Sequence, residues 1–376
     1  MAETPQHTMI ALRYYGPKDL RLEQIPSRAC RPNEVRVKIA YCGICGSDIH
    51  EYLGGPIFPP KAGETNPWTG ESLPVTLGHE FSGVIVELGS AVNGLQVGSR
   101  VSVNPALDDR HYEVEPCTIC QLGKHNICKR YASYGMSADG GGFASEIVVH
   151  AISCIPLPES VSLQVGALLE PLAVAWHSIR LSEFQPRQTA VVLGAGPIGL
   201  AIVMLLRVWG AGHIVVSETT PSRKRMAMHF GADTVVNPAD ATEQDRVLLA
   251  VREVNADGVD VAFDATGLQA TLDTAIAAIR PGGTVFNVAI HERPLQLNLN
   301  KLVCFEKRLI GGICYTRDDF AGVLQALVSG KVPAQDMITS IVPLSEVVQR
   351  GFLELINHKA AHVKILVEPS RFRAHI

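Results

Sequence analysis

Four side chains in the first half of the sequence carry the donor atoms that a zinc ion prefers. Cys45 supplies a thiolate, His79 an imidazole, and Glu80 and Glu170 supply carboxylates. Zinc is bound by donors of these types, and a catalytic zinc site keeps one position open for water or substrate. Taken singly, each residue also has a structural explanation, such as a buried free thiol or a surface glutamate. Glu170 lies in the apolar stretch Gly166–Leu172, where a carboxylate needs a partner or a metal.

A glycine-rich turn far downstream has the spacing of a dinucleotide-binding loop. The segment Gly194-Ala-Gly-Pro-Ile-Gly199 follows the apolar run Thr189–Leu193 and opens a helical stretch, and Glu218 ends the next strand. In such a turn the first glycine permits the tight bend, the second lets backbone approach the pyrophosphate, and the third packs helix against strand. The residues expected to bind the cofactor are Gly194, Gly196, Pro197, Ile198, Gly199, Glu218 and Arg223.

The acid at the end of the second strand favours NAD over NADP. The carboxylate of Glu218 would accept hydrogen bonds from the adenosine ribose hydroxyls and repel a phosphate placed there. Arg223 and Arg225 follow closely and weaken this argument slightly. The alternative is a domain of the same type that binds another ligand or none. The complete order of strand, turn, helix, strand and acid favours NAD.

The second half of the chain predicts a doubly wound parallel sheet. Short β-branched runs alternate with helical stretches from about residue 188 to 313, as in consecutive βαβ units. The predicted strands are Thr189–Leu193, His213–Ser217, Thr234–Val236, Val259–Asp264, Gly283–Val288 and Arg308–Ile313, and the predicted helices are Ile198–Trp209, Arg223–Phe230, Glu243–Val254 and Gln269–Arg280.

The first half predicts a compact antiparallel β domain, because short apolar runs alternate with many Gly and Pro residues. Its runs are Val35–Tyr41, Phe81–Leu88, Arg100–Val103 and Phe143–Val149, and Gly54–Leu73 is predicted to be a loop. The C-terminal tail is expected to pack back onto this domain through helices at Phe320–Val328 and Glu346–Leu355 and a strand at Val363–Val367. We therefore predict an α/β protein with a zinc-binding domain of residues 1–165 and 314–376 and an NAD-binding Rossmann domain of residues 166–313.

Composition excludes several classes of partner. The net charge of −4, spread over 376 residues without a long run of either sign, makes nucleic acid and anionic membrane poor partners. Nine cysteines, an odd number, argue against a secreted disulfide framework, and Met1–Gln6 has no basic segment leading into an apolar one. The uncharged run Thr189–Leu206 is long enough to cross a bilayer, but its glycines divide it into strand, turn and helix. We expect a cytoplasmic protein.

The order of these motifs resembles the zinc-dependent medium-chain dehydrogenase/reductase family. Its members carry a Gly-x-Cys-Gly-Ser-Asp-x-His segment, here Gly43–His50, then Gly-His-Glu, here Gly78–Glu80, and then the glycine turn. The resemblance runs nearly end to end. It implies a GroES-like catalytic domain, Cys45 and His79 as zinc ligands, and Glu80 or Glu170 to complete the set. It also implies a homo-oligomer, either a dimer or a tetramer, and a small alcohol or ketone as substrate.

Two further segments narrow the resemblance. His50–Phe58 and Glu170–His177 look like those of the 2,3-butanediol dehydrogenases, and a glutamate at 170 is typical of the polyol and butanediol branch. The implied reaction oxidises a small secondary alcohol or vicinal diol with NAD. Zinc acts as a Lewis acid, and Ser47 with His50 relays the alcohol proton. The alternatives are a sorbitol- or xylitol-type polyol dehydrogenase, a threonine dehydrogenase, and a noncatalytic nucleotide-binding relative.

A second cysteine cluster is incomplete. Cys117, Cys120 and Cys128 resemble three ligands of the family's four-cysteine structural zinc lobe, but the first position is Val114. A closed tetrahedral site needs a fourth donor. The nearby residues that could supply it are Asp108, Asp109, His111, Glu113 and Glu115. The alternative is three reduced thiols without a metal, and the sequence leaves both open.

Overall fold

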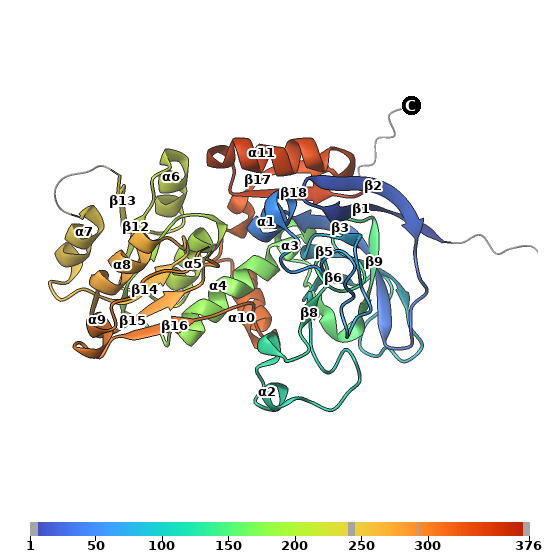
Figure 1. The fold of residues 1–376 in the computed structure, drawn as a ribbon, viewed down its shortest axis with the longest axis horizontal. Coiled ribbons are helices and arrows are strands. Elements are labelled where there is room, and N and C mark those ends of the chain that lie inside the picture. The colour runs from blue at the N-terminus through green and yellow to red at the C-terminus, as the bar shows by residue number, and fades with distance from the viewer. Residues whose placement is uncertain (1–6, 240–244, 292, 371–376) are drawn as a thin grey trace, which may run out of the picture. The chain divides into compact units, whose positions relative to one another are not determined.

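The computed structural model describes residues 7–239, 245–291 and 293–370 (Figure 1). It contains two compact units, one of Met1–Glu170 with Ala334–Ile376 and one of Pro171–Pro333. Residues 314–333, predicted to be in the first domain, thus lie in the second unit, and residues 166–170, predicted to be in the second domain, lie in the first unit. The reason for the former is a buried polar contact: Asp319 of α10 binds the Nδ1 of His177 and the Nε of Arg180, both at 2.8 Å, and both belong to α4.

The second unit is built on the predicted doubly wound sheet. Six parallel strands follow the order β13-β12-β11-β14-β15-β16, with the chain reversing direction across the sheet between β11 and β14. Ligands of such sheets bind outside the carboxyl ends of the strands where the order reverses. The strands are β11 (Thr189–Leu193), β12 (His213–Ser217), β13 (Thr234–Val236), β14 (Val259–Asp264), β15 (Ile279–Asn287) and β16 (Arg308–Gly311). The helices are α4 (Leu169–Leu181), α5 (Pro197–Val208), α6 (Pro221–His229), α7 (Arg246–Val254), α8 (Gln269–Ala278), α9 (Asn300–Val303) and α10 (Arg317–Val328).

The predicted parallel sheet is confirmed, with shifts at the ends of several elements. The strands β11 to β14 have the predicted bounds, whereas α8 ends two residues early and β15 begins at Ile279 instead of Gly283. Ile279 is the register partner of Val259 in β14, so sheet pairing outweighs helical propensity there. Residues 243 and 244 of the predicted helix Glu243–Val254 lie outside the described residues.

The first unit is the predicted β domain. Its largest sheet has the strand order β10-β6-β5-β3-β18-β17, and β9 also pairs with β3. Pairing is antiparallel except between β17 and β18. The strands are β1 (Thr8–Gly16), β2 (Asp19–Pro26), β3 (Glu34–Gly43), β4 (Val75–Thr76), β5 (Glu80–Leu88), β6 (Arg100–Val103), β7 (Ala106–Leu107), β8 (Ala132–Ser133), β9 (Glu146–His150), β10 (Cys154–Pro156), β17 (Ile338–Pro343) and β18 (Lys364–Glu368). The α-helices are α1 (Gly46–Gly54), α2 (Thr118–Gln121), α3 (Leu163–Ala167) and α11 (Leu353–Asn357).

The C-terminal tail packs onto the first unit from residue 334 on, as predicted, whereas the predicted helix Phe320–Val328 is part of α10 in the second unit. Strand β18 pairs with β3, and its Ile365 and Val367 join the buried core of this unit. The segment predicted as one helix, Glu346–Leu355, is instead a π-helical turn at Val348–Phe352 that continues into α11. Within the described ranges, no helix is both long and apolar enough to cross a membrane. The run Thr189–Leu206 is strand β11, a turn and most of α5.

Candidate zinc and nucleotide sites

Pairing between β3 and β5 brings three predicted zinc ligands together. Glu80 is the first residue of β5 and the register partner of Gly43 at the end of β3, and Cys45 follows as the cap of α1. The donor atoms of Cys45, His79 and Glu80 all lie within 4.8 Å of one another. Ligands of a tetrahedral zinc ion at about 2.0 to 2.3 Å lie about 3.3 to 3.8 Å apart. Donors within 4.8 Å of one another can therefore reach one ion with small side-chain movements.

The carboxylate of Glu80 is held by a buried lysine that the sequence analysis missed. Lys364 Nζ donates to both oxygens of Glu80 at 2.7 Å and to the carbonyl of Ile44 at 3.2 Å. Lys364 is 2% exposed and Glu80 is fully buried. Gly43 leaves room for this carboxylate, since a Cβ there would lie 2.0 Å from Glu80 Oε2. The sequence does contain a signal for this buried residue, because Lys364 lies inside the apolar run Val363–Val367.

Negative charge surrounds His79. Burial alone lowers the pKa of His79, but the charges of Asp48, Cys45 and Glu170 outweigh it and raise the pKa well above its usual value. Burial also raises the pKa of Asp48, to about 6. Asp48 Oδ1 lies 3.7 Å from His79 Nδ1, a buried atom without a hydrogen bond to the described residues. The negative charge around His79 therefore favours a cation bound next to its imidazole.

The two residues predicted to relay a proton lie in the first two turns of α1. Ser47 Oγ is 3.4 Å from His79 Nε2, so its hydroxyl lies at the edge of the donor cluster. His50 is three residues further along the same helix face and is exposed. The proton relay stays a prediction. Ser47 lies beside the donor cluster, and His50 faces solvent.

Glu170 lies near the cluster but outside it. In the part of the chain that the structure describes, the group defined by the 4.8 Å spacing contains Cys45, His79 and Glu80 and does not include Glu170. Glu170 is nevertheless buried, and its charge acts on both His79 and Lys364. Its predicted role in binding the metal stays a prediction.

The donor set suits zinc. A thiolate, an imidazole and a carboxylate are the three ligand types that catalytic zinc sites combine, and three protein ligands leave a fourth position open. The buried Nδ1 of His79 and the negative charge around it also fit a bound divalent cation. Cys45, His79 and Glu80 are therefore the residues that would hold the ion.

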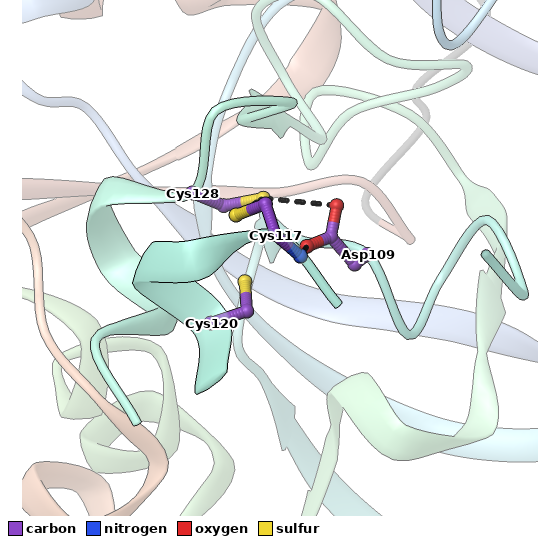
Figure 2. A group of neighbouring side chains, drawn as sticks. All are labelled: Asp109, Cys117, Cys120 and Cys128. Carbon is purple, nitrogen blue, oxygen red and sulfur yellow. Dashed lines mark hydrogen bonds between the residues drawn. The ribbon is translucent and has the colours of Figure 1, made fainter. Parts of the chain in front are cut away.

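The second cysteine cluster includes the carboxylate of Asp109. Asp109, Cys117, Cys120 and Cys128 place one donor atom each within 4.8 Å of one another. Figure 2 shows these four side chains together. The other residues considered as the fourth donor have other partners or are exposed. Asp108 binds Arg110, the Nε2 of His111 lies 3.0 Å from Ser153 Oγ, Glu113 accepts a hydrogen bond from Asn33, and Glu115 is exposed.

The glycine turn has the geometry expected of a pyrophosphate cradle. Gly194 has φ +97°, a left-handed conformation that favours glycine, and a Cβ at Gly199 would lie 1.9 Å from the carbonyl oxygen of Gly194. A Cβ at Gly196 would meet nothing within 4 Å, which leaves open space beside the first turn of α5. Pro197 and Ile198 begin that helix, whose N-terminal amides attract anions.

Glu218 lies beside this turn. Its Oε2 accepts a hydrogen bond from the amide of Ala195 at 2.9 Å, and its Oε1 accepts one from Thr220 at 2.7 Å. Burial alone raises the pKa of Glu218, but these amides and the charge of Arg223 outweigh it and lower the pKa. The carboxylate is therefore ionised near neutral pH. Its Oε1 also accepts a hydrogen bond from Thr219 Oγ1 at 3.4 Å, and its Oε2 keeps a lone pair for a ribose hydroxyl.

Comparisons with known proteins agree with both parts of the chain. The family described as alcohol dehydrogenase GroES-like domain matches residues 31–159, and that described as zinc-binding dehydrogenase matches residues 197–329. An (R,R)-butanediol dehydrogenase of Saccharomyces cerevisiae is 37% identical over 96% of this chain and 98% of its own length. A probable D-xylulose reductase A of Emericella nidulans is 32% identical over 93% of this chain and 94% of its own length.

Solved structures give the same result. The crystal structure of 2R,3R-butanediol dehydrogenase from Bacillus subtilis is 37% identical, covers 96% of this chain and 99% of its own, and has a TM-score of 0.88. Two more distant structures contain nicotinamide cofactors. A putative zinc-binding dehydrogenase of Sinorhizobium meliloti, bound to NADP, is 27% identical, with a TM-score of 0.83 over 97% of this chain and 100% of its own. An Escherichia coli alcohol dehydrogenase complexed with NADH is 26% identical, with a TM-score of 0.84 over 96% of this chain and 99% of its own.

Proposed function

Because the chain belongs to the zinc-dependent medium-chain dehydrogenase/reductase family, we propose that it interconverts a small vicinal diol of the 2,3-butanediol type and its hydroxyketone with NAD. The observation that carries the proposal is the grouping of Cys45, His79 and Glu80 within 4.8 Å. A noncatalytic relative would have no need to keep these three donors together. The identity of 37% to butanediol dehydrogenases over nearly the full length supports the substrate class.

The chain's own residues are proposed to orient the metal ligands and to transfer the alcohol proton. Zinc, when bound, supplies a Lewis acid that lowers the pKa of the alcohol. Lys364 holds the Glu80 carboxylate in one orientation through bonds to both oxygens. Ser47, with its hydroxyl 3.4 Å from His79, is placed to accept the alcohol proton as its own hydroxyl proton moves on, and the exposed His50 would release a proton to solvent.

NAD is the cofactor that the nucleotide site favours. An ionised Glu218 beside the glycine turn accepts hydrogen bonds from ribose hydroxyls and repels a 2′-phosphate. The ratio of kcat/KM for NAD to that for NADP tests this directly. We expect the ratio to fall at least tenfold in Glu218→Ser, about 1.4 kcal/mol of discrimination. Wild-type turnover that is equal or better with NADP would contradict the assignment.

We also propose that the chain forms a homo-oligomer. Strand β16 is the edge strand of the parallel sheet and pairs with β15. Exposed apolar side chains lie on β16 and in the segment just before it. Leu299, Val303, Phe305 and Leu309 are 62%, 74%, 52% and 38% exposed. An open strand edge flanked by apolar surface is suited to pairing with a second copy. Light scattering of the purified protein tests this, and a monomer at micromolar concentration would contradict it.

A substrate panel tests the reaction. Formation of NADH is measured with the butanediol stereoisomers, sorbitol, xylitol and threonine, and its consumption with acetoin. We expect the highest kcat/KM for a butanediol isomer, and loss of activity with a chelator that zinc restores. A preference for xylitol would support the alternative of a polyol dehydrogenase, which the relationship to D-xylulose reductases favours. No activity on any secondary alcohol by zinc-loaded protein would contradict the enzymatic proposal.

A further inference from the structure

The segment from residue 109 to 128 gathers four metal-type donors away from the site described above. Cys117 Sγ and Cys128 Sγ are 3.9 Å apart, and Cys128 Sγ lies 3.3 Å from Asp109 Oδ1. Cys120 completes the group, in which all donor atoms lie within 4.8 Å of one another. Asp109, Cys120 and Cys128 are 1%, 6% and 5% exposed. Three thiols and a carboxylate thus lie together (Figure 2), with Cys117 partly buried and the other three buried.

The position of Asp109 follows from the local backbone. The chain turns between residues 109 and 114, where the amides of Tyr112 and Val114 donate to the carbonyl of Asp109. The turn leaves Val114 39% exposed and places the carboxylate of Asp109 among the thiols. The amide of Cys117 then donates to Asp109 Oδ2 at 2.6 Å, which fixes the carboxylate relative to the first cysteine.

Positive charge and backbone amides support the group from outside. Arg130 donates to Asp109 Oδ1 at 2.6 Å, and its own amide donates to Cys128 Sγ at 3.3 Å. The guanidinium also lies over the ring of Trp68, 4.9 Å from its centroid. Outer partners of this kind orient metal ligands and offset their charge. Arg130 is placed to act as such an outer partner of a metal-bound Asp109.

We propose that Asp109, Cys117, Cys120 and Cys128 bind a second zinc ion, with Asp109 as the oxygen donor in place of a fourth cysteine. Four protein ligands close the tetrahedral shell, so this ion has no open position for a substrate. Binding releases the thiol protons to solvent and leaves three thiolates and one carboxylate around the ion. Arg130 offsets part of the remaining negative charge. The site stabilises the segment and takes no part in hydride transfer.

The test counts zinc in a protein whose other site is disabled. In a Cys45→Ser background, elemental analysis should find one zinc per chain, and competition with a chelator gives its affinity. Asp109→Asn in this background should lower the affinity more than 100-fold, since a lost ligand costs at least as much as a lost outer partner. Glu115→Gln, which changes an exposed acid of the same loop, is the matched control and should leave the affinity unchanged.

A second variant keeps the test decisive if Asp109→Asn fails to fold. Asp109→Cys should fold with metal, and its cobalt-substituted form should show a stronger sulfur-to-metal charge-transfer band, because one more thiolate is bound. Zinc-free Cys45→Ser protein would overturn the proposal. So would an Asp109→Asn affinity equal to that of Glu115→Gln, or a cobalt spectrum unchanged by Asp109→Cys. None of these measurements depends on catalytic activity.

Discussion

The two donor clusters differ in what holds their side chains in place. Cys45, His79 and Glu80 are positioned by the pairing of β3 with β5, and Lys364 reaches them from the C-terminal strand β18. These elements belong to the buried core of the first unit. The lobe donors Asp109, Cys117, Cys120 and Cys128 come from one loop segment with a four-residue helix. The first cluster is therefore preorganised by the fold, whereas the second depends more on its own ion.

The number of protein donors in each cluster agrees with this difference in how the clusters are held. Three protein donors of mixed type leave a coordination position for a substrate, whereas four close the shell. The buried Lys364 beside Glu80 also adds positive charge to the first cluster, which suits a site where a substrate oxygen becomes negative. Loss of the first ion should therefore cost activity, and loss of the second should cost stability.

The largest effect is expected from Cys45→Ser. Removal of the thiolate should lower kcat/KM on the order of 10³-fold or more, because several kcal/mol of transition-state stabilisation come from the ion. Zinc content should fall by one per chain, and the thermal midpoint should change little. Cys30→Ser, which removes a thiol outside both clusters, is the control. A large loss of stability with activity retained would reverse the roles of the two clusters.

The second effect concerns Lys364. Lys364→Met leaves the buried carboxylate of Glu80 without its partner, so the free energy of unfolding should fall by about 3 kcal/mol. Adding Glu80→Gln should recover part of this loss, because the unpaired charge is then removed. Denaturant unfolding measures both, with Lys38→Met on the exposed side of β3 as the control. Equal stability of the Lys364→Met and Lys38→Met proteins would show that the fold does not preorganise the first cluster.

A smaller effect should follow from Arg130→Gln. The change removes the donor 2.6 Å from Asp109 Oδ1, so the lobe should bind zinc about 10- to 100-fold more weakly. The zinc bound by Cys45 and His79 should be unaffected. Arg110→Gln, which disturbs the pair with the neighbouring Asp108, serves as the control. Weaker binding at the first cluster alone would contradict the separation of the two sites.

The smallest effect is expected from Trp68→Leu. The ring stacks under the Arg130 guanidinium, and an interaction of this kind contributes about 1 kcal/mol. Zinc affinity of the lobe should fall about fivefold, less than in Arg130→Gln. Phe58→Leu changes an exposed ring elsewhere in the Gly54–Leu73 loop and is the control. An effect larger than that of Arg130→Gln would mean that Trp68 supports the lobe by another route.

Fold features with a regular period were predictable from the sequence. The β-branched runs of the parallel sheet gave the bounds of β11 to β14, because buried strands need continuous apolar stretches. The end of α8 was not predictable, since Ile279 is drawn into the sheet by its pairing with Val259. The π-helical turn at Val348–Phe352 was missed because its apolar pattern is that of an α-helix.

Site features that depend on contacts between distant residues were not predictable. The motifs identified Cys45, His79 and Glu80, but nothing in the sequence pairs Lys364 with Glu80 across 284 positions. In the lobe, even a contact between residues close in the sequence could not be predicted. Five residues could have been the fourth donor, and the turn that exposes Val114 singles out Asp109. Sequence spacing gives the donor types, whereas the backbone path decides which of them meet.

The most direct test of two differently built zinc sites is anomalous diffraction at the zinc edge from crystals of the wild-type protein. We predict two peaks per chain, one bound by Cys45, His79 and a glutamate, and one bound by Asp109 and the three lobe cysteines. Crystals that lack the peak at Cys45 and His79, grown from protein that turns over a diol, would contradict the account.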